Sequence, residues 1–425
     1  MLSQTKARSL TYSYKGISDV KSESERLPLS RLPVLDNAWP FVPLGELCRL
    51  VNGDAYRESD WTTKGVPIIR IQNLNNAAKP FKHWAGPTDK LVNVKDGDLL
   101  LAWSSTPGTS FGAHFWERGP GLLNQHIFRV DLDRERLCPE WARFSINHGL
   151  EDLIAKAHGA VGLRHVTKRE CEAIPIPLPP LAEQRRLAAQ LRGQLAAVAE
   201  ARAALQAQLK AAAALPAAYL REVFESTAAQ AWPSIAIREV AQMLPAASIS
   251  TAGDTTIRVI TSACLSESGF SPLGIKTATM KKSDATRAIV TPGEILIARS
   301  NTAELVGRCA VAPAGLENIA ASDLTIRLFP DARLDASFAC RYLAYLQLTG
   351  YWKEKAGGAS DTMKKITRGQ LNDLPIPLPS LPEQRAIAAR LDESFARVAT
   401  LRAGLEARLA AVERLPAALL RKVFE

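Results

Sequence analysis

Two segments of this chain occur twice, and in each case the second copy lies 200 residues after the first. Residues 175–191 (PIPLPPLAEQRRLAAQL) return as residues 375–391 (PIPLPSLPEQRAIAARL) with 12 of 17 positions identical. Residues 215–225 return as residues 415–425 with 9 of 11 positions identical. Solenoid repeats have periods of only about 20 to 50 residues. The spacing therefore predicts a duplicated unit that consists of one domain and one helix.

The sequence between the repeated segments diverges but keeps an outline. An Ile-Arg-hydrophobic run occurs at 69–71 and again at 257–259, and a glycine and an acidic residue precede a hydrophobic run at 97–102 and again at 293–298. We therefore expect two modules of similar fold and different surface. The predicted divisions are an N-terminal extension (1–36), a first module (37–174), a spacer helix (175–228), a second module (229–374) and a second spacer helix (375–425).

Length and composition are typical of a globular chain with more than one core. The chain has 425 residues, of which 47% are hydrophobic and 23% charged, and this length favours two or three domains. No run of about 18 apolar residues occurs, and the polar first 26 residues lack the apolar centre of a signal peptide. We expect a cytoplasmic protein without a membrane segment.

Cysteine and histidine spacing gives no sign of a metal site. The six cysteines are far apart and form no CxxC pair, and the six histidines show no ligand spacing. We expect buried free thiols and no metal.

The repeated segments continue into long helices with a heptad pattern. The apolar positions of the first helix are Leu191, Leu195, Val198, Leu205 and Leu209, and those of the second are Leu391, Phe395, Val398, Leu405 and Leu409. Because the two patterns match in length and phase, we expect the helices to pack on each other within one chain. A coiled coil between two chains is the alternative. Pro216 and Pro416 are expected to kink or end the helices, since proline lacks the amide proton.

The net charge of +10 favours a polyanionic partner, and +6 of it lies outside the two repeated helices, mostly in the divergent modules. These features together resemble those of a known family. The motif P-I-P-L-P-x-L-x-E-Q-R leading into a heptad helix, twice per chain after two dissimilar modules, is similar to the DNA specificity subunit of type I restriction–modification systems. The resemblance covers the chain from about residue 39 to 425.

The resemblance implies an α+β fold with two globular α/β target recognition domains, separated by a pair of long antiparallel coiled-coil helices and related by a pseudo-two-fold duplication. Each domain would read one half of a split, asymmetric sequence in double-stranded DNA. The implied partners are two methyltransferase subunits and restriction/translocase subunits. The chain itself would be non-catalytic and carry no cofactor, whereas S-adenosylmethionine, ATP and Mg would be bound by the partner subunits.

Base contacts need side chains that match the major-groove pattern, which are Arg or Lys for guanine and Asn or Gln for adenine. The candidates in the first module are Arg70, Gln72, Asn73, Ser104, Ser105, Asn124 and Gln125, and those in the second are Arg258, Arg299 and Asn301. In our alignment, residues 299–301 take the place of 103–105, and residues 322–323 that of 124–125. The alternative is that Arg70 and Arg258 are alternating strand residues that face water.

Phosphate contacts need only flexible backbone and cations. A glycine-rich turn at 159–165 and its counterpart at 357–361 have this character. The candidate cations are Arg164 and Lys168, then Lys364, Lys365 and Arg368, with a further patch at Lys281 and Lys282. An ordinary connection between a helix and a strand is the alternative.

Two other functions compete with DNA reading. A structural adaptor would use the helices to scaffold partners without sequence-specific DNA binding, but it has no evident need for two different polar modules. A self-sufficient methyltransferase or nuclease would need a glycine-rich cofactor turn, a catalytic Pro-Pro-aromatic motif or a nuclease carboxylate cluster, and none of these patterns occurs.

Overall fold

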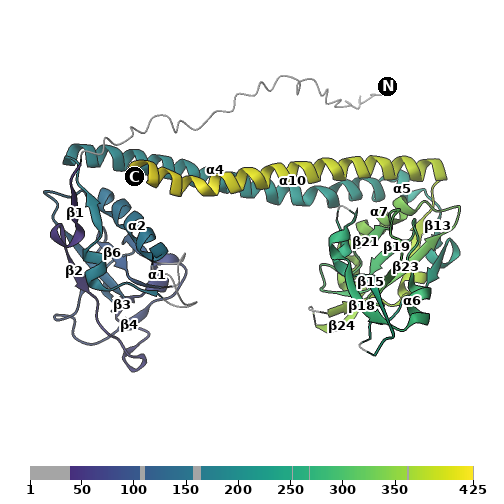
Figure 1. Ribbon diagram of the computed structural model, residues 1–425, viewed down its shortest axis with the longest axis horizontal. Helices are drawn as coiled ribbons and strands as arrows, with labels where there is room; N and C mark the ends of the chain where they lie inside the picture. Colours follow the sequence, from purple (N-terminus) through teal and green to yellow (C-terminus); the bar gives the residue numbers. More distant parts are fainter. Residues whose placement is uncertain are drawn as a thin grey trace, which may run out of the picture. The chain divides into compact units, whose positions relative to one another are not determined.

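The computed structural model describes residues 39–105, 111–156, 164–250, 252–267, 269–360 and 363–424. The predicted extension at 1–36 lies outside these ranges. The chain divides into two compact units, which are unit 1 (Met1–Glu200 with Glu413–Glu425) and unit 2 (Ala201–Val412). Figure 1 shows the elements of each unit. Among the described residues no helix combines the length and apolar character needed to cross a bilayer.

Unit 1 holds two four-stranded sheets. The first is antiparallel with the order β2 (Cys48–Asn52), β10 (Ile127–Leu132), β6 (Leu99–Ala102) and β8 (Gly112–Phe115). The second has the order β4 (Lys82–Trp84), β3 (Val66–Ile69), β9 (Gly121–Leu123) and β5 (Asn93–Val94). Strands β3 and β9 run parallel, so their carboxyl ends meet at one edge of the sheet. This edge carries several of the predicted base contacts.

The core of unit 1 lies between its layers. All four residues of β6 are buried, as expected for an apolar strand that is covered on both faces. Leu100 of β6 packs with Ile69 and Leu123 of the second sheet. The helix α2 (Pro139–Lys156) packs against β8. The remaining elements are β1 (Phe41–Pro43), η2 (Leu44–Glu46), η3 (Glu58–Asp60), α1 (Ile71–Asn75), β7 (Ser104–Ser105), β11 (Arg164–His165), α3 (Lys168–Glu172) and β12 (Pro175–Pro177).

Unit 2 repeats the strand order of unit 1. Its first sheet has the order β14 (Ala241–Leu244), β23 (Thr325–Pro330), β19 (Ile295–Ala298) and β21 (Cys309–Val311). Its second sheet has the order β18 (Lys276–Met280), β15 (Thr255–Ile260) and β22 (Ile319–Ala321), with β15 and β22 parallel. The predicted duplication of the modules is therefore confirmed at the level of topology.

The shorter elements of unit 2 connect these strands. They are α5 (Thr227–Gln230), β13 (Ser234–Ala236), η4 (Ile237–Glu239), η5 (Ser262–Cys264), β16 (Leu265–Ser266), β17 (Gly269–Phe270), η6 (Pro272–Gly274), α6 (Lys282–Ala288), β20 (Ser300–Asn301), α7 (Ala336–Leu348), α8 (Tyr351–Lys355), β24 (Gly357–Ser360), β25 (Met363–Lys365), α9 (Arg368–Asn372) and β26 (Pro375–Pro377). Gly350, with a φ of 90°, separates α7 from α8.

The two long helices are α4 (Leu181–Phe224) and α10 (Leu381–Phe424). Within unit 2 they pack on each other (Figure 1). Leu205, Ala212 and Leu405 form a buried cluster with Leu209, Leu409 and Val412 beside it. The end of α4 and the beginning of α10 meet in another cluster, because Leu220 and Leu391 share the same core. The pairing is therefore antiparallel and lies within one chain, as the heptad pattern predicted.

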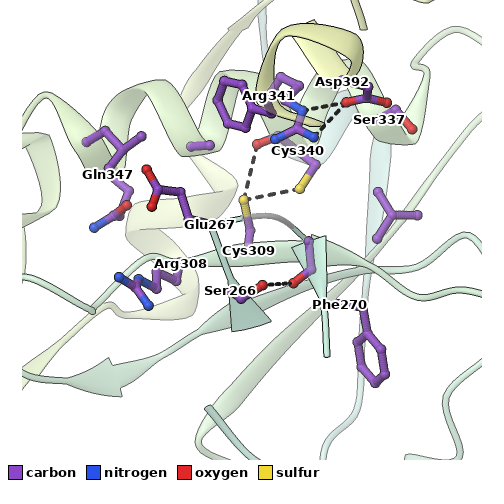
Figure 2. Close-up of a pocket in the computed structure, with 15 residues that line it drawn as sticks. Ser266, Glu267, Phe270, Arg308, Cys309, Ser337, Cys340, Arg341, Gln347 and Asp392 are labelled. Carbon is purple, nitrogen blue, oxygen red and sulfur yellow. Dashed lines mark hydrogen bonds and ion pairs between the residues drawn. The ribbon is translucent and has the colours of Figure 1, made fainter. Parts of the chain in front are cut away.

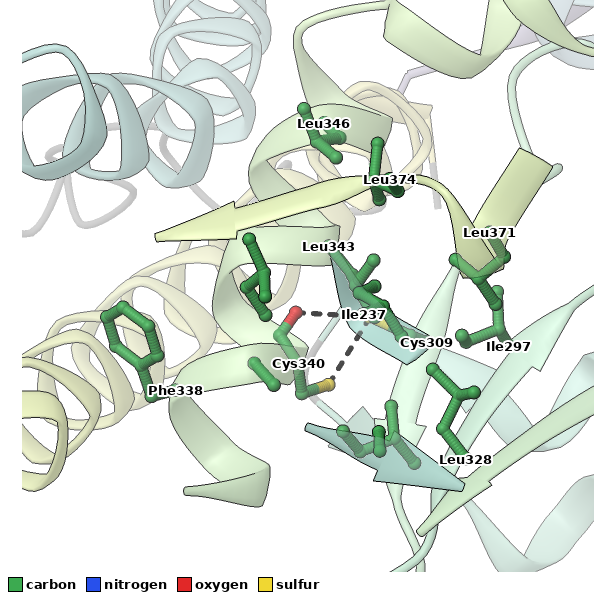
Figure 3. Close-up of a cluster of buried hydrophobic side chains, with 14 of the residues drawn as sticks. Ile237, Ile297, Cys309, Leu328, Phe338, Cys340, Leu343, Leu346, Leu371 and Leu374 are labelled. Atoms are coloured by element: carbon green, nitrogen blue, oxygen red, sulfur yellow. Dashed lines mark hydrogen bonds between the residues drawn. The ribbon is translucent and has the colours of Figure 1, made fainter. Parts of the chain in front are cut away.

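The other predicted seam positions are also covered. Leu191 and Val198 are buried in unit 1, Phe395 and Val398 are buried in unit 2, and Leu195 is half-buried. The ends of the helices are part of the module cores. In the unit 2 core, Leu220 of α4 and Ile387 of α10 pack in one cluster with Phe338 of α7. Figure 3 shows Phe338 with other members of this cluster, among them Leu343 and Leu371.

The expectation that Pro216 and Pro416 could end the helices is wrong. Both helices continue through the proline to Phe224 and Phe424. A proline inside a helix costs about 3 kcal/mol, because one hydrogen bond is lost and the ring crowds the preceding turn. Beyond the prolines, Leu220 and Leu419 are almost completely buried. Burial of a leucine contributes about 1.5 to 3 kcal/mol, so the packed end of each helix offsets this cost.

The first and last strands of each module are hydrogen-bonded to each other, next to the start of a long helix. In unit 1, β1 at the start of the module pairs with β12 of the repeated segment, and in unit 2, β13 pairs with β26. A buried glutamine in the first turn of each helix completes this junction. Gln384 Oε1 accepts the backbone N–H of Asp335 at 2.8 Å, and its Nε2 donates to the carbonyl oxygens of Arg333 and Pro379. Gln184 makes the same three bonds in unit 1.

Candidate nucleic-acid interface

Several chain segments meet at one edge of the unit 1 module. The backbone N–H of Asn124 donates to the Ile69 carbonyl at 3.1 Å, which joins the residues that follow β9 and β3. The Trp103 N–H donates to the His126 carbonyl at 3.4 Å, and the Val166 N–H donates to Trp103 at 3.1 Å. The segments that contain Arg70, residues 103–105, residues 124–126 and residues 164–166 are therefore brought together at this edge.

The pairing of β7 with β11 extends this edge. Ser104 lies opposite His165, and Ser105 lies opposite Arg164. The backbone thus places Arg164 next to the serine pair, but the side chains of Ser104, Ser105 and Arg164 lie outside the described residues, as does most of the glycine-rich turn at 159–165. The Trp103 ring stacks on Phe128 at 5.7 Å between ring centroids.

The equivalent edge of unit 2 has the same backbone and different side chains. Arg299 N–H donates to the Leu324 carbonyl at 2.8 Å, and Ile366 N–H donates to Arg299 at 2.9 Å. Strand β20 pairs with β25, so that Ser300 lies opposite Lys365 and Asn301 lies opposite Lys364. The predicted match of residues 299–301 with 103–105 is confirmed.

The match of Arg258 with Arg70 is wrong by three residues. In the parallel pairs, Ile69 lies opposite Leu123 and Ile260 lies opposite Ala321. Arg70 directly follows Ile69, so its counterpart is Thr261, and both residues precede a short helix. Arg258 lies within β15 and is exposed. It fits the alternative of a strand residue that faces water.

Arg70 lies against an aromatic ring. Its guanidinium carbon is 4.8 Å from the centroid of Trp61, and the ammonium of Lys82 is 5.2 Å from the same ring. A cation near an aromatic ring is held by the negative charge of the ring face. Trp61 therefore positions two cations of this module, a role that the sequence did not indicate.

Asn73 has a structural role and is withdrawn as a base-contact candidate. It is only 2% exposed. Its Oδ1 accepts the backbone N–H of Arg70 at 3.1 Å, and its Nδ2 donates to the Lys79 carbonyl at 3.2 Å. Both ends of the amide are thus used to fold the loop around α1. The neighbouring Gln72 is exposed.

The remaining polar candidates differ in the burial and the hydrogen bonds of their side chains. Asn124 and Gln125 are half-buried, and Gln125 Nε2 lies 3.4 Å from His126 Nε2. Arg299 donates to the carbonyl of Asp323 at 3.1 Å, and Asn301 accepts the N–H of Thr302 at 2.9 Å. These bonds fix the direction of the side chains at the edge.

The phosphate candidates are mostly exposed cations. Lys365 and Arg368 are exposed, and Lys281 and Lys282 are exposed at the start of α6. Lys168 lies 3.6 Å from Glu172, and the Lys364 ammonium donates to the Gly358 carbonyl at 3.4 Å. The predicted turn at 357–361 is largely strand β24, which forms a hairpin with β25. Gly358 has a φ of 134°, and a Cβ there would lie 2.3 Å from the Met363 carbonyl, so the hairpin requires glycine.

The structure offers no metal site among the residues that it describes, since no three His, Cys, Asp or Glu side chains are grouped to bind an ion. All six cysteines are free; four are buried and two are half-buried. Burial raises the pKa of Cys48 and Cys171 to about 12, so both remain thiols at neutral pH.

Comparison with known proteins identifies the family. The model of the type I restriction modification DNA specificity domain matches residues 37–210 and, a second time, residues 231–411. The chain belongs to this family. The two matches to the DNA specificity domain begin close to the two strands, β1 and β13, that close the modules.

Relatives of this family match the chain to different extents. The type I restriction enzyme EcoBI specificity subunit of Escherichia coli is 26% identical over 182 residues, which is 40% of this chain but only 35% of that protein. The StySPI specificity subunit of Salmonella potsdam is 22% identical over 92% of this chain and 89% of that protein. A solved chain, described with the complex assembly and conformational transition of the type I R-M system, has a TM-score of 0.72. The match covers 91% of this chain and 97% of that chain at 22% identity, and it shows that the two share a fold.

Proposed function

We propose that this chain is the sequence-specific DNA-binding subunit of a type I restriction–modification system, with one module for each half of a bipartite, asymmetric target. The observation that carries the proposal is the pair of equivalent edges. Residues 103–105 and 299–301 share their strand pairing, but one edge presents Trp-Ser-Ser and the other Arg-Ser-Asn. Arginine prefers guanine and asparagine prefers adenine in the major groove, so the two edges are suited to different bases.

We assign to the long helices the role of setting the distance between the two half-sites of the target. Each has 44 residues, which corresponds to about 66 Å at 1.5 Å per residue. One turn of DNA is about 34 to 36 Å long. A helix of this length is sufficient to determine an unread gap between two half-sites.

The proposal also assigns partners. The helices would bind two methyltransferase subunits, and restriction/translocase subunits would join the assembly. S-adenosylmethionine, ATP and Mg would belong to those subunits, while this chain would be non-catalytic. Because DNA and its modification enzymes are the proposed partners, we place the protein in the cytoplasm.

Methylome sequencing tests the proposal. A host that carries this chain with its methyltransferase should show a methylated motif of two unequal halves with a fixed gap. Exchange of residues 232–373 for the module of a relative should change one half and leave the other intact. No bipartite motif, or a change in both halves after the exchange, would contradict modular reading.

The two other functions predict different results. A scaffold without sequence-specific binding would bind unrelated duplexes as tightly as the methylated motif, with equal dependence on salt. A self-sufficient methyltransferase would bind S-adenosylmethionine as an isolated chain, which calorimetry would detect as heat. Neither result is expected here.

A further inference from the structure

Cys309 and Cys340 are neighbours in unit 2 although they lie 31 positions apart in the sequence. Their Sγ atoms are 3.3 Å apart, and Cys309 Sγ donates to the Cys340 carbonyl at 3.1 Å (Figure 2). Cys309 is on β21 and Cys340 is on α7. The thiols therefore connect a sheet and a helix that the sequence alone does not bring together.

The fold does not require this pair. Register places Val311 opposite Ile295 in unit 2 and Phe115 opposite Leu99 in unit 1, so the counterpart of Cys309 is Ala113. The two buried glutamines align the helices: Gln384 binds the N–H of Asp335 and Gln184 that of Cys138. The counterpart of Cys340 is therefore Arg143. An alanine and an arginine fill these two places in unit 1.

A small cavity reaches both thiols. It has a volume of about 160 Å³, and its lining includes Cys309, Cys340, Arg341 and Asp392 (Figure 2). A water molecule occupies about 30 Å³ in the liquid, so the cavity has room for a molecule as small as hydrogen peroxide. The two cysteine residues are only 6% and 8% exposed, which excludes most larger reagents.

The surroundings shift the pKa values of the two thiols in opposite directions. Contact with the Cys309 thiol and the charge of Arg341 lower the pKa of Cys340, while burial opposes this shift. The contact with Cys340, together with burial, raises the pKa of Cys309. Arg341 is held in place by Asp392 at 2.7 Å and by the ring of Phe395 at 4.2 Å. Because the thiolate is the reactive form, the neighbouring charge of Arg341 favours Cys340 as the attacking group.

We propose that Cys309 and Cys340 form a dithiol modification site that hydrogen peroxide converts into a disulfide. The Cys340 thiolate attacks one peroxide oxygen, the O–O bond breaks, and a sulfenic acid and hydroxide form. The Cys309 thiol then attacks the sulfenic sulfur, the S–O bond breaks and water leaves. The proton that Cys340 releases when it becomes a thiolate converts the hydroxide into water. In total the dithiol loses two electrons and two protons, and peroxide becomes two waters.

The new bond would tie β21 to α7. The residue after Cys340, Arg341, contacts Asp392 and Phe395 of α10, so α7 links the thiols to the long helix. The modification would therefore stiffen the junction between the unit 2 module and α10. Unit 1, with alanine and arginine in these places, would be unaffected. The site does not depend on the proposed DNA function.

Peptide mapping of the full chain tests the site. The reduced protein is treated with hydrogen peroxide in its native state, then unfolded, alkylated with N-ethylmaleimide and digested. We expect a linked peptide that contains residues 309 and 340, with the mass of two hydrogen atoms lost, which dithiothreitol reverses. Recovery of both cysteines in alkylated form, while Cys48 or Cys138 is oxidised, would overturn the proposal.

Variants test the order of events. C309A introduces the residue that unit 1 carries at this place, so we expect it to fold, as circular dichroism would show. Without the resolving thiol, the sulfenic acid at Cys340 should persist and react with dimedone that is present while the treated chain is unfolded. C264A removes a buried thiol from a separate cluster and should form the disulfide at the same rate as the parent chain. Absence of dimedone labelling at Cys340 in both C309A and C309S would contradict the mechanism.

Discussion

The guanidinium of Arg327 and the carboxylate of Glu294 form two hydrogen bonds of 2.7 and 2.8 Å, although both side chains are almost completely buried. Arg327 also donates to the carbonyl oxygens of Pro245, Arg287 and Ile289. It thus joins three chain segments of unit 2. Its counterpart in unit 1, Arg129, is paired with Asp131 and its side chain is 25% exposed.

Loss of the buried arginine should be costly. We expect Arg327→Met to lower the free energy of unfolding of unit 2 by about 3 to 5 kcal/mol, because Glu294 would remain as an uncompensated buried charge. The matched change Arg129→Met should cost only about 1 kcal/mol, since that pair is partly exposed. Hydrogen exchange of peptides from 285–330, compared with those from 95–132, would separate the two effects. Equal loss of protection in both would contradict the expectation.

Gln72 and Asn73 should respond differently to substitution, although they are adjacent. Asn73→Ala removes two hydrogen bonds of a buried side chain and should lower stability by about 1 to 3 kcal/mol. Gln72 is exposed, so Gln72→Ala should leave the unfolding midpoint in urea unchanged. If the module reads DNA, only Gln72→Ala should weaken binding without loss of stability. An unstable Gln72→Ala would show that the loop is held differently.

We expect Trp61 to affect DNA binding indirectly, through the two cations that lie against its ring. We expect Trp61→Leu to weaken binding of the cognate duplex by roughly 0.5 to 1 kcal/mol per released cation contact. Trp61→Phe should keep most of the affinity, because a ring remains. Trp84→Leu is the control, since Trp84 packs on Tyr56 at 5.6 Å in the same module. Fluorescence anisotropy titrations would measure all three, and equal losses for Trp61→Leu and Trp84→Leu would assign the effect to folding.

The short helices α3 and α9 should differ in their response to acid. Each begins with a capping box, Thr167 with Glu170 in unit 1 and Thr367 with Gln370 in unit 2. Hydrogen bonds from the Thr167 hydroxyl and N–H lower the pKa of Glu170 below its ordinary value of 4.5. This stabilisation is complete above pH 4.5 and is lost as the pH falls through the lowered pKa. Gln370 does not titrate.

Amide exchange, corrected for its intrinsic pH dependence, would reveal this difference. Residues 167–173 should lose protection a few-fold on acidification while residues 367–373 do not. Glu170→Gln should make the first segment behave like the second. Loss of protection at both segments would indicate general acid unfolding.

The helices and the duplicated outline could be predicted because burial follows a fixed period along the chain. Leu205 and Leu405 lie at heptad positions and are buried in the same cluster. The hydrophobic runs after Gly97 and Gly293 became the central strands β6 and β19. Local patterns of this kind require no knowledge of distant residues.

The sequence-based predictions were wrong where contacts between residues far apart in the chain determine the structure. Arg70 and Arg258 have similar neighbours in sequence, but the parallel pairing with β9 and β22 fixes where each strand ends. The burial of Asn73 depends on a bond to Lys79 after the chain turns back. Gln384 belongs to the repeated motif, yet its role became visible only with its partners Arg333 and Asp335. The contact between Cys309 and Cys340 likewise depends on the packing of α7 on β21.

The strand pair next to the start of each long helix has a consequence for recombination between genes of this family. Because β1 is bonded to β12 and β13 to β26, the chain enters and leaves each module at one place. The leaving strand lies inside the repeated segment, where the two copies have 12 of 17 positions identical. Homologous recombination within this segment would join two proteins at a matching strand pair and a matching glutamine. One genetic crossover could thus replace a whole module while its strand pair and its glutamine stay matched.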